Sequence, residues 1–100
     1  MKRRPVVYTG EAGDDLEWIY DTIARASSPL TASSYEQRIR MFCERLDYAS
    51  SRGHRRDDIR QGLRIIGFER RVTVAFVVDE KQVTILRVFY GGRNWEDDLA

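Results

Sequence analysis

The first third of the chain has the hydrophobic spacing of a short strand followed by an amphipathic helix. Residues 6–8 are β-formers that end at Thr9 and Gly10, which predicts a strand. A helix is expected from about Glu11, because apolar residues then recur at every third or fourth position and acids occupy the opposite face. The apolar stripe consists of Leu16, Ile19, Tyr20 and Ile23.

A second helix is expected from Pro29 to about Ala49. Ser28 is a good N-cap, and Pro29 suits the first helical position because its missing N–H needs no partner there. The break between the two helices is short, so they are predicted to form an antiparallel hairpin. The apolar stripe of this second helix recurs at steps of four and three residues: Tyr35, Ile39, Phe42, Leu46 and Ala49.

The second half of the chain has the pattern of an antiparallel meander. A polar, arginine-rich segment over residues 50–61 is expected to be a loop with at most one helical turn. Short links separate the β-like runs that follow, and Asn94 is expected to cap a short terminal turn. These runs are Leu63–Phe68, Arg71–Asp79 and Gln82–Tyr90.

The order β-α-α-β-β-β predicts an α+β fold. A helical hairpin would pack on a mainly antiparallel four-stranded sheet, as a single domain over residues 1–100. Both faces of the sheet are largely apolar, although the chain has only one helical layer. Strict alternation places Val83, Ile85, Arg87 and Phe89 together. The face with Arg87 and Phe89 is expected to be partly bare and to bind a partner, unless the arginine-rich loop and the terminal turn cover it.

The composition is that of a soluble globular protein. Apolar residues make up 42% of the chain and charged residues 33%. No apolar run approaches the length of a membrane span, and no export signal is expected after the basic residues 2–4. Cys43 stands alone, which argues against an internal disulfide and fits a reducing cytoplasm. With His54 as the lone histidine, a Cys/His zinc site is not expected.

The charge is unevenly distributed although the net charge is only +1. Residues 52–71 hold seven arginines against Asp57, Asp58 and Glu69, and residues 11–21 hold five acids and no base. Fifteen of the seventeen basic residues are arginine, whose planar fork suits carboxylates and phosphates. The second half therefore predicts a basic surface for an anionic partner, unless these arginines pair within the chain.

Four segments with distinctive residues follow one another: AGDDLEWIYDTIA (12–24), PLTASSYEQRIRMFCERL (29–46), RRDDIRQGLRIIGF (55–68) and QVTILRVFYGGRNWEDDL (82–99). In this order they resemble the RelE/ParE toxin superfamily, and its ParE-like branch in particular. The third segment contains the GLR motif of that superfamily, and the fourth is similar to its I-L-R-V-x-H/Y-G-x-R ending. The resemblance covers nearly the whole chain and implies the RelE/ParE fold.

The resemblance implies the toxin of a type II toxin-antitoxin system, held inactive in the bacterial cytoplasm by a cognate ParD-like antitoxin. ParE-like members inhibit DNA gyrase, block replication, arrest growth and stabilise plasmids. RelE-like members are ribosome-dependent mRNA endonucleases. A member with another target, or one that only binds its antitoxin, is the third hypothesis.

Residue chemistry favours the ParE-like activity. RNA cleavage without a metal needs cations for the phosphorane charge and groups that transfer protons. Arg64, Arg87 and Arg93 supply cations, but Tyr90 stands where many relatives carry histidine, and tyrosine is a poor base at neutral pH. The chain is therefore expected to lack catalysis of its own. If it is RelE-like, these four residues are the catalytic candidates.

The resemblance and the sheet pattern together give two sets of contact residues. For each set an alternative role is open. Arg64 and Arg93 could form ion pairs with the acidic helix, and Trp95 could close the core. Trp18, Met41 and Tyr48 could instead join the two helices. No metal, cofactor, membrane or sequence-specific nucleic acid is expected to bind the toxin alone. The target-binding candidates are Arg64, Arg87, Phe89, Tyr90, Arg93 and Trp95; the antitoxin-binding candidates are Trp18, Met41, Tyr48, Arg87 and Phe89.

Overall fold

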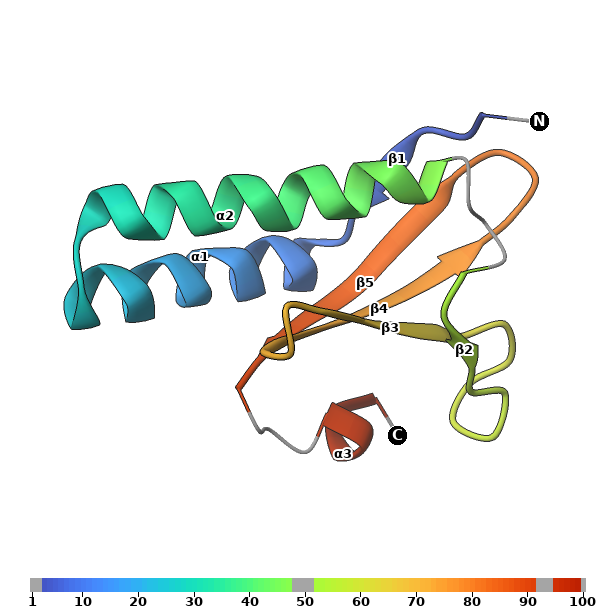
Figure 1. Cartoon of the computed structure of the whole chain (residues 1–100). Helices are drawn as coiled ribbons and strands as arrows, with labels where there is room; N and C mark the ends of the chain where they lie inside the picture. The colour runs from blue at the N-terminus through green and yellow to red at the C-terminus, as the bar shows by residue number, and fades with distance from the viewer. Residues whose placement is uncertain (1–2, 48–51, 92–94, 100) are drawn as a thin grey trace.

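Two long helices lie side by side over one face of a β-sheet, and a short third helix lies on the other side (Figure 1). The computed structural model describes residues 3–47, 52–91 and 95–99. Among these residues, no helix is long and apolar enough to cross a membrane. The helices are α1 (Gly10–Ala26), α2 (Pro29–Glu44), which continues into a 3-10 turn, η1 (Arg45–Asp47), and α3 (Trp95–Leu99).

The sheet has the strand order β1-β5-β4-β3-β2. The first strand pairs in parallel with the last one, and the other neighbours are antiparallel. The α+β prediction is confirmed, but the sheet has one strand more than the four expected. The strands are β1 (Val6–Tyr8), β2 (His54–Arg55), β3 (Arg64–Phe68), β4 (Val72–Val78) and β5 (Val83–Tyr90).

The additional strand, β2, lies in the segment that was expected to be a loop. Its two residues pair with Ile65 and Arg64 of β3 and are both exposed, so no hydrophobic alternation marks them. Gly53 allows the close approach: its φ is 83°, and a Cβ there would lie 2.7 Å from the Ile65 carbonyl oxygen. A side chain at this position would push the strand away.

The second long helix starts at its predicted cap, Ser28, and the first starts at Thr9, a cap that was not predicted. The Thr9 hydroxyl accepts a hydrogen bond from the Ala12 N–H at 3.1 Å, and the Ser28 hydroxyl accepts one from the Thr31 N–H at 3.1 Å. Each satisfies an N–H that has no partner within the helix. The second helix was expected to run to about Ala49, which lies outside the described residues; the α-helix ends earlier, at Glu44, and the 3-10 turn follows it to Asp47.

The main core lies between the two long helices and the sheet. Its helical side chains include the predicted stripe residues Leu16, Ile19 and Ile39, which are at most 1% exposed. Phe76 and Ile85 meet them from β4 and β5 and are fully buried. Cys43 belongs to the same cluster, as expected for a small apolar residue next to the stripe.

A β-bulge in β5 corrects the expected assignment of side chains to sheet faces. Ala75 lies opposite Arg87 while Phe76 lies opposite Ile85, so Leu86 is an extra residue on β5. One extra residue reverses the alternation beyond it. Ile85 before the bulge and Val88 after it therefore both belong to the core under the helices, which strict alternation does not allow.

The second face of the sheet is covered, so the expectation of a bare face is wrong for the described residues. Phe89 is 1% exposed and forms a small core with Leu63, Ile65 and Ala75. The covering residues come from the arginine-rich loop and the terminal helix, whose few apolar side chains do not form a periodic pattern. They are Ile59, Trp95 and Leu99, together with Leu86.

Candidate functional site

Arg87 is held by an acid of α1 at the edge of the sheet. Its Nε donates to Asp15 Oδ2 at 2.7 Å and its second nitrogen donates to Asp15 Oδ1 at 3.0 Å. The Val88 N–H also donates to Asp15 Oδ2 at 2.9 Å. The short strand β1 reaches only as far as Ile85 along β5. The Asp15 carboxylate therefore occupies the edge of β5 beyond β1 and fastens the helix there.

This ion pair defines what Arg87 can do. Hydrogen bonding to Asp15, together with the charges of Asp15 and Glu11, raises the pKa of the guanidinium and outweighs the desolvation that lowers it. Glu11 is more remote, at 3.8 Å, and the guanidinium lies over the Phe89 ring at 4.8 Å. The side chain is 16% exposed, so Arg87 serves the fold and presents little charge to a partner in this conformation.

Arg64 lies on β3, away from Arg87. Its partner residue on β4 is Phe76, and β4 separates β3 from β5. One Arg64 nitrogen donates to the Arg52 carbonyl at 3.5 Å, which places this guanidinium beside the chain that leads into β2. The structure therefore does not bring Arg64 and Arg87 together as a pair of cations.

Trp95 closes the small second core from α3, which is the alternative role expected for it. The guanidinium of Arg56 lies 5.4 Å from its ring centre and also pairs with Glu96 at 2.7 Å and Asp58 at 2.8 Å. These hydrogen bonds raise the pKa of Arg56. Arg56 thus ties α3 to the arginine-rich loop, a role that its sequence surroundings do not indicate.

Tyr90 belongs to an aromatic cluster at the far end of β5. Its ring lies 6.5 Å from that of Trp18 and 6.1 Å from that of Tyr35, edge to face in both cases. Trp18 is 50% exposed and contacts the sheet through Tyr90. Burial raises the pKa of Tyr35. Beside the cluster lies a depression of about 260 Å³ lined by Ile23, Thr31, Tyr35, Glu69, Arg71 and Tyr90.

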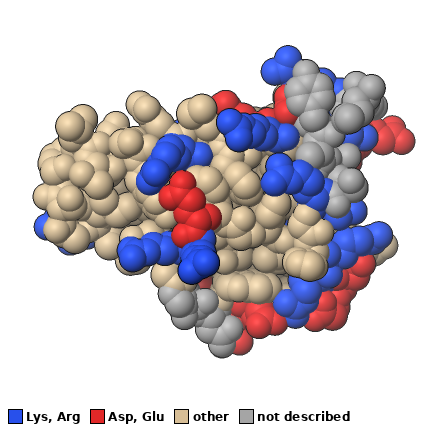
Figure 2. Space-filling view, in the orientation of Figure 1, with Lys and Arg blue, Asp and Glu red and all other residues tan. Residues whose placement is uncertain are grey.

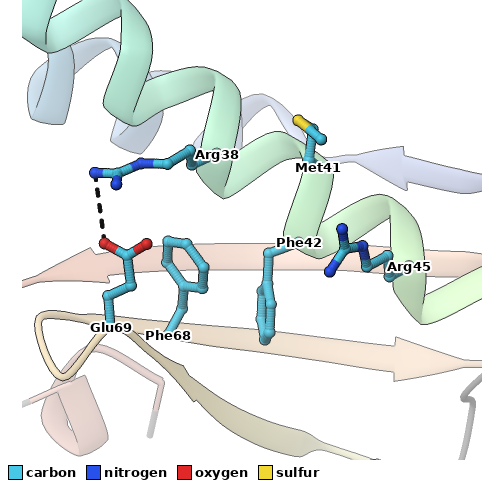
Figure 3. A pocket seen from close by; sticks show the side chains of 6 residues that line it. All are labelled: Arg38, Met41, Phe42, Arg45, Phe68 and Glu69. Atoms are coloured by element: carbon cyan, nitrogen blue, oxygen red, sulfur yellow. Dashed lines mark ion pairs between the residues drawn. The ribbon is translucent and has the colours of Figure 1, made fainter.

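A groove of about 160 Å³ lies between α2 and the turn that joins β3 to β4. In Figure 3, Phe42 of α2 and Phe68 of β3 approach each other in the groove, and Arg38 reaches Glu69. The two phenyl rings are 4.8 Å apart, and Met41 is 55% exposed. We call this site the α2 groove; it is defined by Arg38, Met41, Phe42, Arg45, Phe68 and Glu69.

Sequence reasoning identified Met41 but missed the other residues of the α2 groove. Arg38 and Arg45 are seven residues apart, which places them on the same face of a helix, on either side of Met41 and Phe42. That spacing was the available signal. The contribution of Phe68 and Glu69 depends on the sheet register, which the helix sequence does not contain.

The α2 groove lies on a basic face. Figure 2 shows Lys and Arg side chains spread over the surface formed by α2 and the sheet. The guanidinium of Arg52 lies 5.6 Å from the centre of the Phe42 ring. Glu69 is the one acid among the six residues that define the groove.

Arg38 and Arg45, which line the α2 groove, lie outside the segment 52–71 that was expected to form the basic surface. In that segment Arg55 and Arg56 pair with Asp57, Asp58 and Glu96, which was the alternative.

Some of the predicted residues are not part of the sites described above. Arg93, Tyr48 and the cap Asn94 lie outside the described residues. His54 is exposed on β2. In the parts of the chain that the structure describes, no three His, Cys, Asp or Glu side chains are grouped so that they could hold a metal ion.

Comparison with known proteins agrees with this architecture. The sequence family described as "ParE toxin of type II toxin-antitoxin system, parDE" matches residues 6–95. The chain is also similar to a solved structure described as "Chromosomal ParDE TA system from P. aeruginosa", with 26% sequence identity and a TM-score of 0.78. That match covers 91% of this chain and 99% of the other. No curated protein sequence gives a significant match.

Proposed function

This chain belongs to the family of ParE toxins of type II toxin-antitoxin systems, and on that premise we propose that it inhibits DNA gyrase. In this proposal the toxin binds gyrase in the bacterial cytoplasm, blocks replication and arrests growth. A cognate ParD-like antitoxin neutralises it. Through this pair it stabilises the plasmid or chromosomal segment that encodes both proteins.

The use of Arg87 inside the fold is the observation that most supports inhibition without catalysis. A nuclease needs a cation that faces the scissile phosphate. Arg87 instead donates two hydrogen bonds to Asp15 and is largely buried. Tyr90, the candidate for proton transfer, packs against Trp18 and Tyr35 at the end of β5. These two residues are therefore better explained as structural than as catalytic.

Arg64 and the terminal segment are the proposed gyrase contacts, from two places: the β4 partner of Arg64, Phe76, belongs to the main core, and Trp95 belongs to the core on the other face of the sheet. Trp95 is partly buried and keeps part of its surface accessible beside Arg56. Arg93 belongs to the same proposed surface and precedes α3 by two residues. Aromatic and arginine side chains frequently dominate the energy of protein interfaces, which suits this combination.

The test uses the purified toxin in gyrase supercoiling and DNA cleavage assays, with in vitro translation run in parallel. We expect inhibition of supercoiling and accumulation of cleaved DNA, with translation unaffected. Arg64→Ala should weaken gyrase binding and toxicity in proportion, because there is no chemical step to lose. Arg25→Ala, at the exposed end of α1, is the matched control and should change neither.

Deletion of residues 94–100 tests the terminal part of the proposed surface. The truncated toxin should lose gyrase binding, provided that circular dichroism shows a folded protein, since Trp95 also closes the second core. Full toxicity of a folded truncation would remove α3 from the gyrase-binding surface. Cleavage of mRNA on ribosomes by the wild-type toxin would contradict the gyrase proposal and favour the RelE-like activity.

A further inference from the structure

The turn that joins β3 to β4 has a strained backbone. Its residues Glu69 and Arg70 have φ angles of 49° and 65°, in the left-handed region. They are the only residues other than glycine with a positive φ in the part of the chain that the structure describes. Two consecutive positive φ angles mark a turn that Gly, Asn and Asp dominate. Glutamate and arginine are therefore costly choices at these positions.

Contacts inside the chain do not explain these two residues. Glu69 lies 3.5 Å from Arg38, but the two side chains are 40% and 53% exposed, and exposed pairs contribute little stability. Arg70 is exposed and forms no ion pair with any residue that the structure describes. Backbone strain of this kind is concentrated at functional sites, where a contact outside the fold offsets its cost. An external contact therefore explains Arg70 better than a structural role does.

The strained turn lies beside the chain that leads to α3. The Gly91 N–H donates to the Arg71 carbonyl at 2.8 Å, and Figure 1 shows the turn next to the end of β5. Arg71 is exposed, as Arg70 is. We call these two residues the turn arginines. They stand at the start of the terminal segment, in which Arg93 and Trp95 are the proposed gyrase contacts.

We infer that the turn arginines bind carboxylates on the surface of the toxin's protein target, and that the strained turn is retained because it presents Arg70 to solvent. Guanidinium groups match carboxylates in a two-bond geometry that lysine cannot form. The inference rests on the proposed function in identifying the target as gyrase. It extends the terminal gyrase contact to the turn between β3 and β4.

A DNA backbone fits the turn arginines less well. Binding through phosphates engages a row of cations that follows the backbone. Here two cations adjoin each other, and the acid Glu69 directly precedes them. A protein surface needs only one or two carboxylates in the right place to pair with them. Acidic side chains of a protein are therefore the contact that the observations favour.

The main test compares gyrase binding, measured by biolayer interferometry, with thermal stability, measured by circular dichroism. Arg70→Gly removes the strain and the charge together. We expect its Tm to rise by about 4–8 °C while its affinity for purified gyrase falls about three- to tenfold. These opposite signs identify a contact residue, because a variant that binds poorly through misfolding would melt at a lower temperature.

Two further variants separate the charge from the strain. Arg70→Glu reverses the charge without relieving the strain, so it should weaken gyrase binding more than tenfold and leave the Tm without a gain. Arg70→Lys keeps the charge but lacks the planar fork, and should weaken binding about two- to threefold. Lys81→Glu is the matched control: it reverses an exposed charge in the turn that joins β4 to β5 and should leave binding unchanged.

Gyrase binding that is insensitive to Arg70→Glu would overturn the inference, and so would an Arg70→Gly variant that melts no later than the wild type. A 20-base-pair DNA duplex that binds the toxin alone, and binds Arg70→Glu less, would assign the turn arginines to nucleic acid instead. If the wild-type toxin ignores gyrase, the proposed function fails separately. Growth arrest in cells then decides: Arg70→Glu should abolish it, and full toxicity of this variant would overturn the inference as well.

Discussion

Two largely buried charged side chains, Asp15 and Arg87, join distant parts of this protein. Asp15 satisfies three donors on β5, two from Arg87 and one from the Val88 backbone. Because the side chains of Asp15 and Arg87 are only 11% and 16% exposed, water replaces these bonds poorly. Asp15 is thus the main polar link between α1 and the sheet edge that β1 leaves open.

Removing the Asp15 carboxylate should destabilise the protein strongly. Asp15→Ala leaves a largely buried guanidinium and a backbone N–H without their acceptor, and we expect a loss of about 2–3 kcal/mol in the free energy of unfolding. Urea denaturation followed by circular dichroism measures this loss. Glu11→Ala is the control, since Glu11 is 77% exposed and lies 3.8 Å from Arg87, and it should have little effect. Equal effects of the two variants would show that Asp15 has no special role.

Because the Cys43 thiol is buried, we expect the free energy of unfolding to fall at alkaline pH. Burial raises the pKa of its thiol from 9.0 to about 11. The unfolded chain therefore releases this proton at lower pH than the folded protein, and the stabilisation is lost as the pH rises from about 9 towards 11. The loss is on the order of 2 kcal/mol for this group. Burial also raises the pKa of Tyr8, which acts in the same direction at higher pH.

Urea denaturation at pH 7, 9 and 10.5 measures this dependence. Cys43→Ala should unfold more easily at every pH but show a smaller decline above pH 9. The folded wild-type protein should also resist a thiol reagent at pH 8, because Cys43 is 0% exposed. Rapid labelling without unfolding would contradict the burial of this thiol.

The helices depend on their caps and on the packing of one face each. The second helix starts at Ser28, whose hydroxyl bonds the Thr31 N–H at 3.1 Å. The short α3 lacks a comparable buried face, since none of its five residues is fully buried. Its stability comes from Trp95 on the second core and from the ion pair between Arg56 and Glu96.

Loss of the cap at Ser28 should weaken the second helix measurably. We expect Ser28→Ala to cost about 1 kcal/mol, because an N–H of the first turn loses its acceptor. Ser27→Ala is the neighbouring control: its hydroxyl makes only a 3.4 Å contact with the Thr31 hydroxyl and should matter little. Thermal and urea denaturation compare the two. A control variant as unstable as Ser28→Ala would show that the loss comes from the helix connection in general.

The attachment of α3 should depend on the indole more than on the ion pair. Trp95→Ala uncovers the second core, and we expect a loss of about 2 kcal/mol, less than for a fully buried tryptophan. Glu96→Gln keeps the ring in place and breaks only an exposed ion pair, so its effect on urea denaturation should be small. The reverse order would mean that Arg56, and not the apolar contact, holds α3.

The whole molecule has two apolar cores on opposite faces of one sheet. The larger contains Val74, Phe76 and Val88, and the smaller contains Ala75 and Phe89. Both cores thus draw on β4 and β5, the strands at the centre of the sheet. Neither core can lose its packing without disturbing strands that the other needs, so the chain is expected to unfold in one step.

The two tryptophans can test this cooperativity, because Trp18 lies on the helical side and Trp95 on the other. In Trp18→Phe the remaining fluorescence reports on the smaller core, and in Trp95→Phe it reports on the end of β5. In each variant the fluorescence transition should coincide with the circular dichroism transition of the same variant. An earlier fluorescence change from Trp95 would show that α3 detaches before the sheet unfolds.

Local sequence information was sufficient for the main helices and strands. The cap at Ser28, the strand end at Thr9 and Gly10, and the periodic stripes act over a few residues, so the start of each long helix and the three strands of the meander could be predicted. The family resemblance also depended on such local segments and their order. Met41 was predicted either to contact the antitoxin or to join the two helices; it is 55% exposed, and the groove beside it was not predicted.

Tertiary structure decided the features that join residues far apart in the chain. The parallel pairing of β1 with β5, the bulge at Leu86 and the bond from Asp15 to Arg87 each link segments separated by many residues. The same holds for Trp95, which covers Phe89, and for Phe68, which completes the α2 groove. No short-range pattern encodes these contacts, because they depend on how whole elements pack once the sheet register is set.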